Sequence, residues 1–277
     1  HALAELRHVE ERVANAIELI EGVSLYGGFA GDEPADFDLN ERDFVENATI
    51  LDGQNTRRIV NQALAFDEPT YVDGFTIQNG YYSSYSSGVY LRANGTLINC
   101  IVTNNRGGSS TIYAVYANEN AHVENCVVTN NSIIGVFARE NATVSHCTIT
   151  NNAKGGVELL NNSGSPSTTI MDNCLVANNS GNYGVYSYGL TCKIINCDIV
   201  NNANVGLSGG SGSVINTIIW GNNNGGQQYS GSSYEITYSA VQGGYEGEGN
   251  LNLEADNFGT DPEAAYVCFM NPTPATG

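Results

Sequence analysis

The chain has 277 residues, of which 14% are charged and 41% are hydrophobic, with 32 glycines and a formal net charge of −19. Few charges, together with many Asn, Gly, Ser, Thr, Val and Ile, exclude a chain dominated by surface helices and favour β-structure with many turns. Nucleic acid and anionic membranes need clustered Lys and Arg, so we expect binding to neither, and no apolar run approaches the ~18 residues of a membrane span.

The negative charge is concentrated at the two ends of the chain. Residues 1–68 contain 15 acidic and 5 basic residues, residues 69–235 contain 8 and 5, and residues 236–277 contain 6 and none. The central body is therefore almost neutral, and the simplest role of the acidic ends is solubility. The chain begins at His1 without a methionine or a signal peptide, so we expect a mature product or a fragment.

The N-terminal stretch has the pattern of an amphipathic helix. Apolar side chains recur there at helical spacing with charges between them: Leu3, Leu6, Val13, Ile17 and Ile20. We predict one helix over residues 1–22 that covers the open end of the repeated body, because bare sheet edges promote polymerisation. A docking helix for a partner protein is the alternative.

An acidic loop follows the predicted helix. Asp36, Asp38 and Asn40 stand at positions 1, 3 and 5 of an EF-hand-like loop, but Glu41 and Asn47 replace the glycine and glutamate that such a loop needs. We interpret this stretch as a solvated loop. We therefore expect no cofactor. Calcium binding at this loop is the one alternative, and the sequence identifies no set of metal ligands.

Eight units with a common pattern follow one another between about Val72 and Gly243. Each has a β-type segment of about seven residues that ends in Asn-Asn or Gly-Asn, then a variable loop, then a second short β-type segment. Phe75, Thr217 and Ser239 hold the opening position in three units. Cysteines hold it in the other five, with gaps of 26, 21, 27 and 23 residues: Cys100, Cys126, Cys147, Cys174 and Cys197.

Units this short cannot bury their own apolar side, so they must stack into a solenoid with one continuous core. The leucine-rich-repeat consensus is absent, which leaves the parallel β-helix. We predict an all-β, single-stranded parallel β-helix, right-handed as parallel crossovers usually are. The predicted divisions are a capping helix at 1–22, an opening segment and first coil at 23–71, the repeats at 72–243 and a closing segment at 244–277.

The five cysteines are predicted to form an interior column. In stacked coils, equivalent residues lie ~4.8 Å apart, and we expect Val123, Cys126 and Val128 to point inward around a bend at Asn125. Parallel side-chain directions are poor for disulfides, and no C-x-x-C pair suggests zinc, so we predict free packed thiols. The Asn-Asn pairs should form a matching column at the turn. Cys192 and Cys268 lie off the column, and their pairing is left open.

The second short segment places a column of side chains on the outside of the coil. Strand alternation turns Val89, Val115, Val136, Val157 and Val185 inward, and turns the intervening residues outward: Tyr90, Tyr116, Phe137, Glu158 and Tyr186. Exposed, stacked aromatic side chains could bind sugar rings or a partner surface. The alternative is that these rings pack on each other or beneath long loops.

Three stretches resemble secreted bacterial right-handed parallel β-helix repeat proteins of planctomycetes and Bacteroidetes, which have a pectate-lyase-like fold. Residues 25–53, with LYGGFAGDE and ERDFVENATILDG, resemble their opening segment, VDGFTIQNG at 72–80 their first full coil, and residues 238–262 their closing segment. The resemblance implies the fold and an extracellular or cell-surface location. It implies little about activity, because fold does not determine function.

Catalytic residues are hard to find in the repeated body. A uronate lyase needs basic residues for the substrate carboxylate and a base for the α-proton. Arg92 and Arg139 occupy equivalent positions about 10 Å apart, but no acid cluster clearly accompanies them. Glu119 and Glu140 share one turn position. The remaining titratable residues, such as His122 and His146, have no partner that the sequence identifies.

We therefore favour a secreted or cell-surface protein with a structural or adhesive role and no catalysis. Its partner would be a polysaccharide, a surface protein or other copies of itself, contacted through Tyr90, Tyr116, Phe137 and Tyr186. The alternative is a polysaccharide lyase or another carbohydrate-active enzyme, in which Arg92 and Arg139 would contact the substrate. A fragment of a larger protein, with its function elsewhere, is a third reading.

Overall fold

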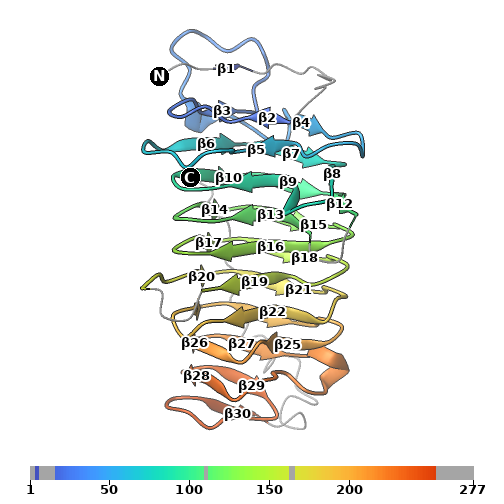
Figure 1. Ribbon diagram of the computed structural model, residues 1–277, viewed down its shortest axis with the longest axis vertical. Helices are drawn as coiled ribbons and strands as arrows, with labels where there is room; N and C mark the ends of the chain where they lie inside the picture. Colours follow the sequence, from blue (N-terminus) through green and yellow to red (C-terminus); the bar gives the residue numbers. More distant parts are fainter. Residues whose placement is uncertain (1–3, 6–15, 109–111, 162–165, 254–277) are drawn as a thin grey trace.

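The computed structural model describes residues 4–5, 16–108, 112–161 and 166–253. Over these residues the chain winds into a parallel β-solenoid whose coils stack along one axis (Figure 1). The predicted all-β class and parallel solenoid are confirmed. Helical structure in the described residues is limited to two short 3-10 turns, η1 (Leu39–Glu41) and η2 (Asn222–Gly225), and no described helix is long and apolar enough to span a membrane.

Three long sheets run along the solenoid. The first sheet contains β1 (Ala4–Glu5), β3 (Leu25–Tyr26), β6 (Thr70–Asp73), β10 (Gly95–Ile98), β14 (His122–Glu124), β17 (Thr143–Ser145), β20 (Ile170–Asp172), β23 (Lys193–Ile195), β26 (Ser211–Ile215) and β28 (Ser233–Thr237). The second contains β4 (Thr49–Asp52), β7 (Phe75–Gln78), β11 (Ile101–Thr103), β15 (Val127–Thr129), β18 (Thr148–Thr150), β21 (Leu175–Ala177), β24 (Asp198–Val200), β27 (Ile218–Trp220), β29 (Ala240–Gln242) and β30 (Leu251–Leu253). The third contains β2 (Ile17–Glu18), β5 (Val60–Asn61), β9 (Ser86–Leu91), β13 (Tyr113–Ala117), β16 (Ile134–Arg139), β19 (Val157–Leu160), β22 (Tyr183–Tyr188) and β25 (Val205–Ser208). A separate pair joins β8 (Tyr81–Tyr82) to β12 (Arg106–Gly107).

Each of the eight predicted units contributes one strand to the first sheet and one to the second. The register places equivalent residues of successive units opposite each other, as for Val123, which pairs with Leu97 on one side and Val144 on the other. Because all the described pairs are parallel, each sequence position becomes a column of side chains along the solenoid.

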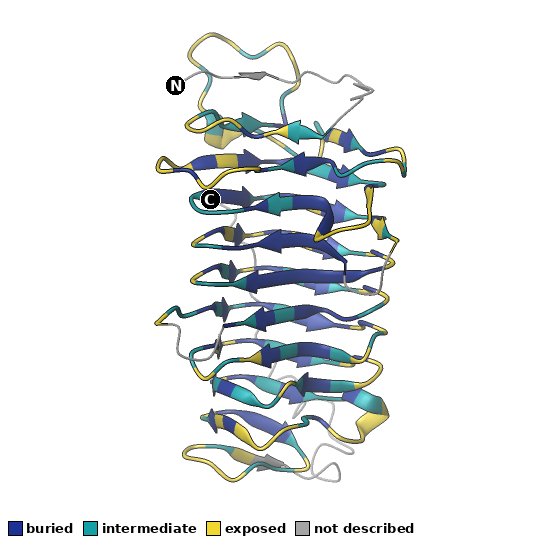
Figure 2. Ribbon diagram, in the orientation of Figure 1, coloured by how far each residue is buried: buried dark blue, intermediate teal, exposed yellow. Residues whose placement is uncertain are grey.

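The core is a continuous column of inward side chains. Figure 2 shows the buried residues along the strands and the exposed residues mainly at the turns. On the second sheet, Val102, Val128 and Ile149 are completely buried, as are their counterparts in the following coils. Each such side chain stabilises the fold by about 1.5–3 kcal/mol relative to an exposed one, so stability accumulates coil by coil.

Two left-handed residues bend each coil between its strands. Asn125, immediately before Cys126, has a φ of 49°, and Asn130, the first of the Asn-Asn pair, has a φ of 57°. Asparagine tolerates this conformation better than other residues with a side chain. The conformational requirement explains why asparagine recurs both before the cysteine and four residues after it.

The second asparagine of each pair forms a buried amide column. Six asparagines of consecutive coils form it, and a glutamine six residues after the last of them ends it: Asn105, Asn131, Asn152, Asn179, Asn202, Asn222 and Gln228. The Nδ2 of Asn152 donates to the Oδ1 of Asn179 at 3.0 Å and to the carbonyl of Val128 at 3.0 Å. Asn152 therefore connects its own coil to both neighbouring coils, and the other asparagines between Asn105 and Asn222 do the same.

The five column cysteines are buried free thiols that lie inside the solenoid. The Sγ of Cys126 donates to the carbonyl of Glu124 at 3.1 Å, and its counterparts repeat this contact in their own coils. Cys192 is also free, and burial raises its pKa to about 11, which keeps the thiol neutral. Cys268 lies outside the described residues.

The helix predicted over residues 1–22 is not found in the described part of that range. The structure has β1 and β2 there, and the segment between them lies outside the described residues. Ile17 packs against the core and Leu19 is buried, whereas Ile20, expected on the apolar face of the helix, is 66% exposed. Ile17 and Glu18 form a strand rather than part of a helix because β2 pairs with β5. The backbone edge of β5 would otherwise be open.

Replacing Asn152 by alanine should destabilise the solenoid strongly. The substitution leaves the carbonyl of Val128 and the amide N–H groups of Asn131 without their partners in a buried site. We expect a loss of about 3 kcal/mol in the free energy of unfolding, measured by urea denaturation followed by circular dichroism. Asn204→Ala removes one exposed hydrogen bond, to Gly181, and serves as the control. Equal losses in the two variants would contradict a stabilising amide column.

Candidate functional site

The aromatic column predicted on the second short segment lies on the outer face of the third sheet. Register pairs Tyr116 with Tyr90 and with Phe137. The ring of Tyr116 stacks on both, with centroids 5.1 Å from Tyr90 and 4.5 Å from Phe137. Tyr186 lies farther along the same column, beyond Glu158. The outward direction of these side chains agrees with the prediction.

Most of this column is covered by its neighbours. Tyr113 and Ile134 pack on it, so that Tyr116 and Phe137 are each only 6% exposed. Tyr85 covers Tyr116 from another side with an edge-on ring contact at 5.3 Å. The middle of the column is therefore a small second core outside the coil.

Glu158 interrupts the row of rings and is held by two phenols. Its carboxylate accepts hydrogen bonds from the hydroxyl of Tyr113, at 2.6 Å, and from the hydroxyl of Tyr183. Burial and the nearby carboxylate raise the pKa of both phenols, so both remain protonated donors. This arrangement satisfies the charge that the strand pattern places among aromatic side chains.

Exposed tyrosines gather beside the covered column, in residues 81–85, which we call the tyrosine loop. Tyr81, Tyr82 and Tyr85 are 38%, 41% and 53% exposed. Tyr85 also has a φ of 59°, a conformation that bulky side chains rarely adopt. Such strained positions persist only where the surroundings fix them, and they cluster at functional sites.

Arg58 fixes the tyrosine loop to the third sheet. Its guanidinium donates to the carbonyls of Ser84 and Ser86 at 2.9 Å each. It also lies 4.3 Å from the ring centre of Tyr82 and 5.0 Å from that of Tyr90. Through these hydrogen bonds and ring contacts, Arg58 positions the loop and its rings.

The two arginines expected at a substrate site are each engaged by an acidic residue. Arg92 binds Glu119 through two nitrogens, at 2.8 and 3.1 Å. Arg139 lies 3.0 Å from a carboxylate oxygen of Glu140 and donates to the Oδ1 of Asn118 at 2.8 Å. The shared turn position of the two glutamates thus supplies ion pairs, and a substrate carboxylate would have to displace them.

The other residues singled out in the sequence do not converge. Asp38 caps η1 by accepting from the backbone N–H of Asn40, and Asp36 is exposed. His122 bonds to the hydroxyl of Thr143, and His146 is exposed at a coil bend. Within the described residues, no group of three or more His, Cys, Asp or Glu side chains is placed to hold a metal ion.

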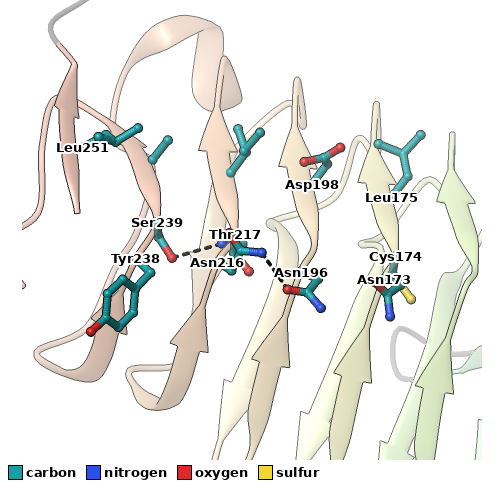
Figure 3. Close-up of a pocket in the computed structure, with 12 residues that line it drawn as sticks. Asn173, Cys174, Leu175, Asn196, Asp198, Asn216, Thr217, Tyr238, Ser239 and Leu251 are labelled. Atoms are coloured by element: carbon teal, nitrogen blue, oxygen red, sulfur yellow. Dashed lines mark hydrogen bonds between the residues drawn. The ribbon is translucent and has the colours of Figure 1, made fainter. Parts of the chain in front are cut away.

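A pocket of about 580 Å³ lies where the first sheet bends into the second, and we call it the bend pocket. Its lining comes from successive coils: Asn173, Cys174, Leu175, Asn196, Asp198, Asn216, Thr217, Ile218, Tyr238, Ser239, Ala240 and Leu251. Figure 3 shows two rows of side chains: Asp198 lies in line with Leu175 and Leu251, and Asn196 and Asn216 lie in the other row. The left-handed bend residues project outward and supply the amide row.

Asp198 is the unusual member of the pocket. Register places it between Leu175 and Ile218, in a column that is otherwise mostly apolar. Burial raises the pKa of its carboxyl group, and within the described residues its carboxylate has neither a hydrogen bond nor an ion pair. Carboxyl groups of this kind, in a pocket, are candidates for binding or proton transfer.

The sequence contained a signal for this site that residue-by-residue reasoning missed. Asp198 is one of the remaining titratable residues of the repeated body, for which the sequence identifies no partner. The residue after the repeated cysteine is Ile, Val, Thr, Leu and then Asp in successive units. A charged residue at an otherwise uncharged position of the repeat marks the site. It is recognised only when the aligned units are compared position by position.

Comparison with known proteins identifies the fold. Residues 43–169 match a family model described as the right-handed β-helix region. The A-module of the mannuronan C-5 epimerase AlgE4 from Azotobacter vinelandii is 13% identical, with a TM-score of 0.54 over 92% of this chain and 78% of that one. A pectate lyase, Pel9A, is 13% identical, with a TM-score of 0.52 over 90% and 68%. A search of curated protein sequences found no match.

These likenesses confirm the predicted resemblance to right-handed β-helix proteins with a pectate-lyase-like fold. At 13% identity they concern the fold alone. Any activity therefore has to be argued from the surfaces of this chain.

Replacing Tyr116 by alanine should destabilise the protein. The ring is 6% exposed and stacks on two other rings, so its removal leaves a cavity in the outer cluster. We expect a loss of about 3 kcal/mol in the free energy of unfolding. Tyr188→Ala, at a tyrosine that is 52% exposed, is the control and should change stability little. A stable Tyr116→Ala protein would show that the outer cluster contributes little.

Replacing Asp198 by asparagine should stabilise the protein at pH 7. Because burial raises the pKa of Asp198, its charged form is disfavoured in the folded state, and this cost is present above the folded-state pKa. We expect a gain within about 1 kcal/mol at pH 7. The gain should shrink as the pH falls through the folded-state pKa and disappear below ~4, where the carboxyl group is protonated in both states. Thermal melts at several pH values, with Glu124→Gln as an exposed control, test this; a gain independent of pH would contradict it.

Proposed function

Because the chain is a right-handed parallel β-helix, we propose that it serves as a non-catalytic carbohydrate-binding scaffold outside the cell or on its surface. The tyrosine loop is its contact surface. The proposal rests on one observation: three exposed tyrosines in a single loop that Arg58 fixes in place. Rigid, amphipathic rings of this kind bind sugar rings through their faces and sugar hydroxyls through their own.

The arrangement of the loop supports binding over simple packing. Rings that only stabilise the coil become covered, as Tyr116 and Phe137 do. Tyr81 and Tyr82 instead remain exposed on β8, which pairs with β12 in a separate two-stranded sheet. The guanidinium of Arg106, on β12, lies 5.7 Å from the ring centre of Tyr81 and adds a cation to the surface. Because the fold already orders these side chains, little conformational entropy is lost when a ligand binds.

Similar folds make a polysaccharide a reasonable ligand class. The two solved structures with related folds are a mannuronan epimerase and a pectate lyase, both named for acting on polysaccharides. An extended solenoid suits a polymer, because its columns repeat the same groups at ~4.8 Å intervals along one axis.

The alternative is a polysaccharide lyase or another carbohydrate-active enzyme, which the fold of the pectate lyase favours. Arg92 and Arg139 would then have to exchange Glu119 and Glu140 for the substrate carboxylate. In such an exchange each arginine replaces its ion pair with a glutamate by an ion pair with the substrate, so the net gain in binding free energy is small. We therefore rank the enzyme second.

A glycan array with the purified protein is the direct test, followed by titration of the best ligand. We expect the double variant Tyr81→Ala/Tyr82→Ala to lose about 10-fold or more in affinity, because it removes two exposed contact rings. Tyr188→Ala removes an exposed tyrosine from the third sheet, away from the loop, and should bind normally.

Three outcomes would contradict the proposal. Binding that survives in the double variant would exclude the tyrosine loop as the contact surface. Release of unsaturated products from a uronate polymer, lost in Arg139→Ala, would establish the lyase. Polymers or sheets in light scattering and negative-stain electron microscopy, with no glycan bound, would favour self-assembly.

A further inference from the structure

The bend pocket has the features of a second binding site, independent of the tyrosine loop. It lies at the bend between the first and second sheets, whereas the tyrosine loop lies between the second and third. The pocket also extends over successive coils, so a ligand within it would contact several coils together.

The charge of the pocket is unbalanced. Asp198 brings a carboxylate into a half-buried position, and none of the lining residues that the structure describes is basic. Lys193, on β23 of the same coil, is exposed on the first sheet and forms no ion pair with Asp198. A partly desolvated carboxylate gains most from a cation that reaches it directly. A cationic group on a ligand would supply the missing charge.

The amide row provides hydrogen bonds for a polar ligand. The Nδ2 of Asn216 donates to the Oδ1 of Asn196 at 2.7 Å. Within the described residues, this leaves the Nδ2 of Asn196 as a donor and the Oδ1 of Asn216 as an acceptor for hydrogen bonds to a ligand. A donor and an acceptor in adjacent coils match hydroxyl groups, which can serve as either.

The other row provides apolar contacts. Leu175, Ile218 and Leu251 line the pocket on the second sheet, and Leu251 is 53% exposed. Tyr238, at the end of the amide row, is 54% exposed. Aliphatic and aromatic side chains beside hydrogen-bonding groups suit the mixed polar and apolar faces of a sugar.

We propose that the bend pocket binds an amine-bearing carbohydrate, with the ammonium group on Asp198 and the hydroxyl groups on Asn196 and Asn216. Charge complementarity selects this class over uronates, which would bring a second negative charge beside Asp198. A single carboxylate is also too few ligands for a divalent cation.

The test uses the full chain and a glucosamine tetrasaccharide as the probe, titrated calorimetrically. The matched probes are the N-acetylated tetrasaccharide, which has the same ring but no charge, and a galacturonate tetrasaccharide, which is anionic. We expect the glucosamine probe to bind at least about 10-fold more tightly than either, because a hydrogen bond to a charged group is stronger than one between neutral groups.

Two variants localise the binding. Asp198→Asn keeps the shape of the side chain and should weaken binding of the glucosamine probe by about 10-fold or more. Leu175→Arg places a cation beside Asp198 in the neighbouring strand and should abolish binding. Glu124→Gln, at an exposed carboxylate of the first sheet, should have no effect. Circular dichroism confirms that each variant is folded.

The proposal is overturned if the glucosamine probe does not bind, if the N-acetylated probe binds equally well, or if Asp198→Asn binds as well as the unchanged protein. The Tyr81→Ala/Tyr82→Ala variant separates the two sites. It should bind the glucosamine probe normally, and a loss there would assign that binding to the tyrosine loop instead.

Discussion

The buried amide column is the interaction on which the rest of the structure depends. The Nδ2 of Asn131 donates both to the Oδ1 of Asn152 in the next coil and to the carbonyl of Val102 in the preceding one. A shift of one residue between coils would break both bonds and turn the inward column outward. Once this register is set, every other position of the repeat becomes a column as well.

Columns change the way in which surface residues acquire a function. Like residues in a column satisfy one another, as Tyr116 does when it stacks on Tyr90 and Phe137. The informative positions are those where a column is interrupted. Glu158 interrupts the rings and is satisfied by two phenols, whereas Asp198 interrupts an apolar column and has no such partners in the described structure. This difference separates a structural acid from a candidate ligand contact.

The two candidate surfaces also differ in charge. The tyrosine loop lies beside Arg58 and Arg106, and the bend pocket contains a carboxylate. Both depend on residues from several coils, so both need the solenoid for their geometry. A protein with two separate sites of opposite character would connect two different ligands, a role that requires no catalytic group.

The repeated pattern by itself determined the solenoid, the inward cysteines and the asparagine column. These features follow from the identity of residues within one unit and from the fact that identical units stack. The tertiary structure alone decided which outward side chains are covered. Tyr113 and Ile134 cover Tyr116, and the exposure of Tyr82 depends on where Arg58 holds its loop.

Tertiary contacts also decided the structure near the N-terminus and the isolation of Asp198 in the bend pocket. Ile17 and Ile20 fit helical spacing, whereas Ile17 and Leu19 fit strand alternation, and the open edge of β5 decided between the two. Asp198 is one acid among several in the sequence, and its isolation appears only when Leu175 and Ile218 are placed on either side of it. A periodic pattern specifies how units stack, but the loops and edges that cover or expose a given side chain come from other parts of the chain, and the packing of those parts is not periodic.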